Sequence, residues 1–174
     1  MNQRRTDIDK QSQVEEGTKR KKNDLIVITG AGGFIAGNLV LYFKQKGFTR
    51  IRAVDKKQLG DWYLRVPQVE SLSLDCTHED NCHRVCEGAV EVYNLAADMG
   101  GMGFIERFRV ACLRSILINT HMIEVACRAG ARRYFFSSSA CAYNTLLQQD
   151  PRVTALTPLR GFDPSAQNLS DASH

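Results

Sequence analysis

The chain has 174 residues, of which 43% are hydrophobic and 24% are charged, and its net charge is +4. This length suits one domain with a real core, and the lack of an apolar run of transmembrane length excludes a membrane-spanning class. Most of the excess positive charge lies in residues 1–22, so the near-neutral remainder argues against a nucleic-acid-binding face.

Residues 1–23 are polar and lack hydrophobic periodicity, which predicts a disordered basic tail. The basic run at 19–22 could form a patch for an anionic surface, although a solvated tail is the favoured interpretation. The tail has no apolar stretch of the signal-peptide kind, so we expect a cytoplasmic protein.

A strand, a glycine-rich turn and a helix then organise the chain. The four apolar residues of Leu25–Ile28 predict a strand buried on both faces, as parallel sheets require. Gly30, Gly32 and Gly33 follow, and helical spacing runs over Phe34–Lys46. The N–H groups and dipole of such a helix start attract phosphate, and glycine allows its close approach. The alternative is a tight βα turn that binds nothing.

The second predicted strand, Arg50–Val54, ends at Asp55. This acid follows Gly30 by 25 residues, near the offset at which a dinucleotide site places a carboxylate for the ribose hydroxyls. A carboxylate there repels a 2′-phosphate and favours NAD over NADP. Lys56 and Lys57 weaken this preference without reversing it.

Residues 58–68 are expected to form a loop or a broken short helix, and residues 69–74 a third strand that ends at Asp75. Thr77 and Asp80 have the spacing of a capping box, which predicts a helix from this point to Glu87.

Cysteines and histidines gather in this segment, at Cys76, His78, Cys82, His83 and Cys86. Zinc is the alternative interpretation, but paired Cys-x-x-Cys spacing is missing. Cys82 and Cys86 lie one helical turn apart, as core cysteines often do. We therefore expect reduced thiols and no metal.

Val90–Leu95 is the fourth predicted strand, and small residues follow it from Ala96 to Gly103. Small residues at the carboxyl end of a central strand permit a ligand to approach closely. A long amphipathic helix over 108–128 and a fifth strand over 132–138 come next. The alternation predicts an α/β fold of the Rossmann type, a doubly wound parallel sheet in the order 3-2-1-4-5.

These motifs resemble the extended short-chain dehydrogenase/reductase family, the NAD-dependent nucleotide-sugar epimerases and dehydratases. Thr29–Ile35 is similar to the whole family. Asn94–Ile105 looks like the signature of its GDP-mannose 3,5-epimerase branch. Ser138–Tyr143 supports this branch, because many relatives carry Thr where this chain has Cys141. The resemblance implies an incomplete NAD-binding Rossmann domain over 24–156, followed by a disordered tail over 157–174 that no longer matches the family.

The resemblance also implies a role for each matching residue. Asp55 would bind the ribose and Asp75 would lie near the adenine, while Ala36 takes the third glycine position of the pyrophosphate loop. The implied NAD-binding residues are Gly30, Gly32, Gly33, Phe34, Ile35, Asp55, Asp75, Leu95, Ala96 and Ala97. The implied contacts to a nucleotide sugar similar to GDP-mannose are Gly100, Gly101, Met102, Ser139, Ala140 and Cys141.

The implied reaction is an epimerisation masked by redox chemistry. NAD would oxidise the C4 hydroxyl of the sugar to a ketone, which acidifies the hydrogens at C3 and C5, and would later return the hydride. By the resemblance, Cys141 matches one member of the acid/base pair. A thiol with a pKa of about 8.5 can exchange protons close to neutrality, which suits this role. Ser139 would hydrogen-bond the reacting hydroxyl or ketone. The alternative for Cys141 is a small buried core residue.

The chain departs from the family in its last residues. The hydride step of the family depends on a Tyr-x-x-x-Lys pair on the next helix, and the sequence reaches His174 without it. The formal match at Tyr42–Lys46 lies in the first helix, on the wrong side of the cofactor loop. We therefore expect an inactive N-terminal half of an enzyme. The homodimer typical of the family is expected to be compromised. The aromatic strand at 134–138 is expected to have an uncovered edge and face.

Two functions stay open. The first is an NAD-dependent nucleotide-sugar epimerase in the form of an inactive fragment, and the second is a non-catalytic NAD-binding module with a regulatory role. The small residues at 100–103 and Cys141 favour the first, since a pure NAD binder has no use for them. RNA binding through the basic tail has no support outside residues 1–22.

Overall fold

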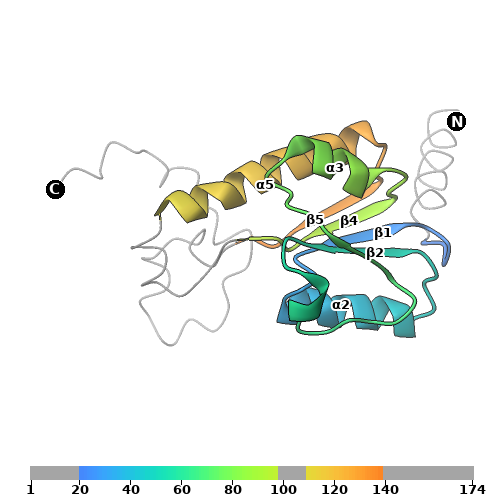
Figure 1. Cartoon of the computed structure of the whole chain (residues 1–174). Coiled ribbons are helices and arrows are strands. Elements are labelled where there is room, and N and C mark those ends of the chain that lie inside the picture. Colours follow the sequence, from blue (N-terminus) through green and yellow to red (C-terminus); the bar gives the residue numbers. More distant parts are fainter. Residues whose placement is uncertain (1–19, 98–108, 139–174) are drawn as a thin grey trace, which may run out of the picture. The chain divides into compact units, whose positions relative to one another are not determined.

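The computed structural model describes residues 20–97 and 109–138, with the backbone alone for 109–112. Its centre is a parallel sheet of five strands in the order β3-β2-β1-β4-β5 (Figure 1). The strands are β1 (Ile26–Thr29), β2 (Ile51–Asp55), β3 (Glu70–Ser73), β4 (Glu91–Asn94) and β5 (Arg133–Phe136). The helices are α2 (Phe34–Gln45), the 3₁₀ turn η1 (Leu59–Asp61), α3 (Glu79–Cys86) and α5 (Arg109–Arg128). The predicted fold class and strand order are confirmed.

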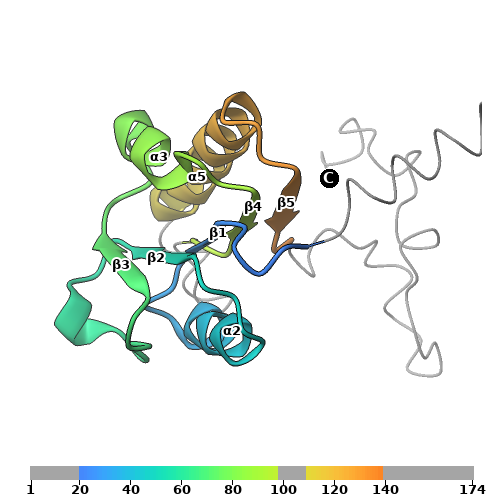
Figure 2. The ribbon, with the colours of Figure 1, turned by 90° about the vertical axis from the view of Figure 1, so that its right-hand side faces the viewer.

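Helices cover both faces of the sheet: α2 lies on one face, and α3 and α5 lie on the other (Figure 2). Side chains alternate across each strand, so Ile26 and Ile28 join the core beneath α2 while Val27 joins the core beneath α3 and α5. All four residues of β1 are buried, as expected for a central parallel strand. The two cores together fix the carboxyl ends of β1, β2 and β4 side by side.

Residues 20–23, which composition assigns to the tail, belong to the fold. Arg20 donates from Nε to Glu91 Oε1 at 3.0 Å and from its terminal nitrogen to the Tyr93 hydroxyl at 2.6 Å. Glu91 is only 1% exposed and also pairs with Arg133. A buried carboxylate needs such partners, and here a residue of the polar stretch supplies one of them.

The predicted capping box at Thr77 and Asp80 is wrong. The N-cap of α3 is His78, whose side chain makes no capping hydrogen bond. Asp75 forms the turn instead, because its Oδ1 accepts from the Thr77 backbone N–H at 2.9 Å and its carbonyl accepts from Asn81 Nδ2 at 2.9 Å. This turn places Thr77 outside the helix.

Candidate functional site

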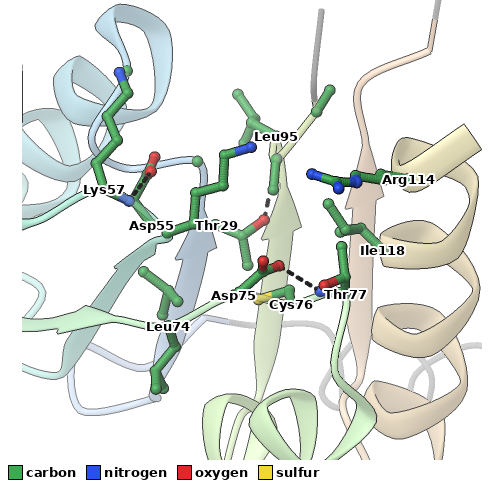
Figure 3. Close-up of a pocket in the computed structure, with 16 residues that line it drawn as sticks. Thr29, Asp55, Lys57, Leu74, Asp75, Cys76, Thr77, Leu95, Arg114 and Ile118 are labelled. Atoms are coloured by element: carbon green, nitrogen blue, oxygen red, sulfur yellow. Dashed lines mark hydrogen bonds between the residues drawn. The ribbon is translucent and has the colours of Figure 1, made fainter. Parts of the chain in front are cut away.

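A cavity of about 350 Å³ opens at the carboxyl ends of the strands (Figure 3). This is within the usual range for ligand sites, and the carboxyl edge is where open α/β sheets bind ligands. Most of the residues predicted to hold a cofactor line it: Gly30, Gly33, Asp55, Asp75, Leu95, Ala96 and Ala97. Lining residues to which the sequence assigned no cofactor role are Thr29, Val54, Leu74, Cys76, Thr77, Arg114 and Ile118.

Gly30 makes the turn from β1 into the loop before α2. Its φ is +73°, and a Cβ there would lie 2.7 Å from the Leu95 carbonyl oxygen. The left-handed backbone and the close approach of β4 both require glycine. The cavity floor is therefore main chain, which a phosphate can approach without meeting side chains.

The N-terminus of α2 fits an anion. Its N-cap is Gly33, no side chain caps it, and its first turn holds no acidic residue. Main-chain N–H groups at such a start, together with the helix dipole, favour a negatively charged ligand. Phe34 and Ile35 belong to this turn but do not line the cavity; the Phe34 ring packs on Tyr63 with centroids 4.9 Å apart.

Asp55 ties the loop to the end of β2. Its Oδ2 accepts from the Gly32 backbone N–H at 3.0 Å, and its Oδ1 accepts from the Lys57 backbone N–H at 2.9 Å. A Cβ on Gly32 would lie 2.9 Å from Asp55 Cγ, so glycine is also needed for this contact. Each carboxylate oxygen keeps accepting capacity for a ligand hydroxyl.

Asp75 lines the cavity from the end of β3 (Figure 3). Burial acts to raise the pKa of Asp75, but the backbone N–H and hydroxyl of Thr77 and the charges of His78 and Lys56 together hold it below its ordinary value. The side chain is therefore an ionised acceptor at neutral pH, suited to the N–H groups of a nucleobase.

A buried polar network supports the cavity from below. Thr29 Oγ1 donates to Asn94 Oδ1 at 2.6 Å and accepts from the Ala96 backbone N–H at 3.3 Å. Asn94 Nδ2 donates to Asn119 Oδ1 at 2.6 Å and to the Tyr134 hydroxyl at 3.0 Å. The network joins β1, β4, α5 and β5 directly behind the loop of Gly30. Sequence reasoning missed it, although Thr29 and Asn94 stand at equivalent strand ends.

Cysteines lie next to Asp75, and one of them lines the cavity. Cys76 lines the cavity, and the buried Cys82 donates from Sγ to the Cys76 carbonyl at 3.2 Å. A hydrogen bond with Cys82 and burial both raise the pKa of Cys76, which keeps this thiol neutral. Across residues 20–97 and 109–138, no group of three or more His, Cys, Asp or Glu side chains is placed to hold a metal ion. In the same ranges, no helix has the length and apolar character needed to cross a bilayer.

The sequence profile of the NAD dependent epimerase/dehydratase family matches residues 26–165. The chain belongs to this family. The predicted family is thus confirmed, and NAD is the cofactor of the family as a whole.

Three relatives show where the chain stands in the NAD dependent epimerase/dehydratase family. GDP-mannose 3,5-epimerase of Arabidopsis thaliana is 40% identical over 142 residues, covering 78% of this chain and 36% of that protein. GDP-mannose 3,5-epimerase 1 of Oryza sativa subsp. japonica is 36% identical over 136 residues, covering 74% of this chain and 34% of that protein. The solved structure of MoeE5 in complex with UDP-glucose and NAD is 27% identical with a TM-score of 0.58, covering 70% and 38%. The chain spans about a third of the length of the curated relatives it matches.

The catalytic and substrate residues predicted from the family lie outside the described residues. These are Gly100, Gly101, Met102, Ser139, Ala140 and Cys141. The formal Tyr-x-x-x-Lys match does lie in the described part. Tyr42 and Lys46 are at the end of α2, with Lys46 Nζ 5.5 Å from the Tyr42 ring centroid, and neither lines the cavity. Their position supports the prediction that this pair is not catalytic.

Proposed function

We propose that this chain binds NAD in the cavity at the carboxyl edge of its sheet. The observation that carries the proposal is the joint geometry of Gly30, the uncapped start of α2 and Asp55. The first two provide a main-chain cradle for the pyrophosphate, and Asp55 provides an acceptor for ribose hydroxyls. Asp75 would accept from the adenine, and Ala96 and Ala97 leave room beside it.

We further propose that the chain is the N-terminal, cofactor-binding part of a nucleotide-sugar epimerase of the GDP-mannose 3,5-epimerase kind. The identity of 40% to the Arabidopsis enzyme supports this substrate class. When bound, NAD would supply reversible hydride transfer at the sugar. Cys141 would exchange a proton with the sugar ring, and Ser139 would hydrogen-bond the reacting oxygen.

The second candidate is a non-catalytic NAD-binding module. Its support is the position of Tyr42 and Lys46, which form a Tyr-x-x-x-Lys pair but do not line the cavity. A polypeptide of these residues is then expected to bind NAD without converting GDP-mannose. Conversion of GDP-mannose, detected by chromatography of the sugar nucleotides, would decide in favour of the enzyme.

We also propose a cytoplasmic location for this chain, because the free thiols of Cys76, Cys82 and Cys86 suit a reducing compartment.

The binding proposal is tested by titration with NADH. Trp62 is the single tryptophan of the chain, and it lies beside Gly32, where an added Cβ would be 3.0 Å from Trp62 Cδ1. Energy transfer from Trp62 to bound NADH therefore reports binding at this site, and calorimetry with NAD gives an independent affinity. Saturable quenching of Trp62 is expected. A flat titration by both methods would contradict the proposal.

A further inference from the structure

Arg114 is a cation of the cofactor cavity that the motifs do not explain. It lies on α5 one helical turn before Ile118, and both side chains line the cavity. In Figure 3 the guanidinium reaches from α5 toward Leu95 and into the space above Asp75. The cavity also includes residues that follow β3 and β4, such as Asp75 and Leu95, so a charged group of α5 shares the cavity with them.

No partner explains this charge within the described ranges. Arg114 is exposed and forms no hydrogen bond or ion pair with another residue of 20–97 or 109–138. Other described arginines, such as Arg52 and Arg128, are paired with carboxylates. The two acids of the cavity are engaged elsewhere: Asp55 accepts from Gly32 and Lys57, and Asp75 accepts from Thr77.

The same cavity contains the loop that suits a phosphate. Gly30 and Gly33 line it with Arg114, and the start of α2 offers N–H groups without an acidic side chain. A guanidinium matches phosphate oxygens with two parallel hydrogen bonds, and it remains charged at every physiological pH. Main-chain donors on one wall and a guanidinium on another are the arrangement that neutralises a diphosphate.

We infer that Arg114 binds the diphosphate of the dinucleotide, acting from α5 together with the N-terminus of α2. The inference rests on the proposed function, since it names a further residue for the same ligand. If Arg114 contacts the diphosphate, the affinity for the cofactor depends on an interaction between charges. The affinity is then expected to fall as the salt concentration rises. It also couples cofactor binding to α5, which packs against α3 and the sheet.

The test compares ligands with and without phosphate. ADP-ribose and adenosine are titrated into the 174-residue chain by displacement of NADH, for the wild type, Arg114→Gln, Arg114→Lys and Arg84→Gln. Arg84 is exposed on α3 and does not line this cavity, so Arg84→Gln is the matched control. Arg114→Gln is expected to weaken the binding of ADP-ribose by about tenfold, since a hydrogen bond to a charged group is lost. The affinity for adenosine is expected to stay unchanged. Arg114→Lys keeps the charge and is expected to lie between.

A second measurement separates a diphosphate contact from other roles. The dependence of NADH affinity on salt is expected to be shallower in Arg114→Gln than in the wild type, while the melting temperature stays the same. Equal losses for ADP-ribose and adenosine, or an unchanged salt dependence, would overturn the inference. A wild-type chain that binds neither NADH nor ADP-ribose would instead overturn the proposed function itself.

Discussion

The carboxylate of Asp55 accepts a hydrogen bond from the backbone N–H of Gly32 at 3.0 Å, across the turn that separates β1 from α2. One side chain thus holds the glycine loop in place and lines the cavity that the loop forms. A substitution at Asp55 is therefore expected to change both the affinity for NAD, if the proposed site is correct, and the stability of the loop, and the two effects must be measured separately.

Asp55→Asn is expected to weaken the binding of NAD by about tenfold, because the ribose hydroxyls lose a charged acceptor. The affinity for NADP relative to NAD is expected to rise, since the carboxylate no longer repels a 2′-phosphate. The amide can still accept from Gly32, so the loss of stability is expected to be about 1 kcal/mol. Asp61→Asn, at an exposed position of η1, is the matched control. Equal NAD affinity in the two variants would contradict the assignment of Asp55 to the ribose.

Gly30→Ala is expected to abolish measurable NAD binding and to destabilise the fold by roughly 1–3 kcal/mol. The added Cβ would lie 2.7 Å from the Leu95 carbonyl oxygen, and alanine is strained at a φ of +73°. Gly60→Ala is the control, because an added Cβ there meets nothing within 4 Å and its φ is outside the left-handed region. Thermal unfolding and NADH titration check both variants. A Gly30→Ala protein that binds like the wild type would disprove the main-chain cradle.

The fold was predictable because its strongest signals are local. Four consecutive apolar residues at 25–28 predict a buried strand, and Gly30 and Asp55 mark two strand ends that line the cavity. The predicted strand positions shift by a residue or two, since hydrogen-bond register decides where a ladder begins and hydrophobicity does not. The family motifs also predict the acidic and small residues that line the cavity.

What the sequence did not predict depends on contacts between distant residues. The pairing of Thr29 with Asn94 needs the register of two strands, which places these residues opposite each other. The contact of Arg20 with Glu91 spans 71 positions, so composition alone places this polar segment in the tail. The periodicity of the helix that carries Arg114 predicts which face of the helix is buried. It does not predict that Arg114 lines a cavity, because the cavity forms only when the strands are assembled.

Thr29→Val is expected to cost about 1–3 kcal/mol of unfolding free energy, measured by chemical denaturation. The substitution keeps the shape of the side chain but leaves the buried Asn94 Oδ1 without its donor and the part-buried Ala96 N–H without its acceptor. Thr120→Val is the control, since its hydroxyl donates to the Ile116 carbonyl on an exposed face where water can replace it. Similar losses in both variants would show that the buried network does not stabilise the fold.

Alkaline pH is expected to destabilise the protein through Tyr134. Burial raises the pKa of Tyr134 to about 12, with smaller effects from nearby thiols and an opposing one from its hydrogen bond with Asn94. In the unfolded chain a tyrosine pKa is about 10. Between these values the unfolded state has lost a proton that the folded state keeps, so stability is full below about pH 10 and falls as pH rises toward 12.

Tyr134→Phe is therefore expected to lower stability at neutral pH, through the lost hydroxyl, and to make the decline between about pH 10 and 12 less steep. Tyr63→Phe, at an exposed ring, is the control and is expected to keep the wild-type slope. The measurement is the free energy of unfolding at several alkaline pH values. An unchanged slope in Tyr134→Phe would contradict the role of this residue in the alkaline decline.

The outer face of α5 is expected to drive self-association. Ile116 and Ile123 are 62% and 52% exposed, and their separation of seven residues places them on one side of the helix. Phe135 and Phe136 of β5 are each about half exposed as well, which agrees with the expectation that the fifth strand is incompletely covered. Apolar surface of this kind favours contact with another chain.

Light scattering is expected to show a mass that rises with concentration, and the double variant Ile116→Lys/Ile123→Lys is expected to stay monomeric with an unchanged melting temperature. Tyr42→Lys, which removes an exposed ring from α2 on the other face of the sheet, is expected to leave association as it is. A wild-type chain that is monodisperse and monomeric at all concentrations would show that α5 needs no partner.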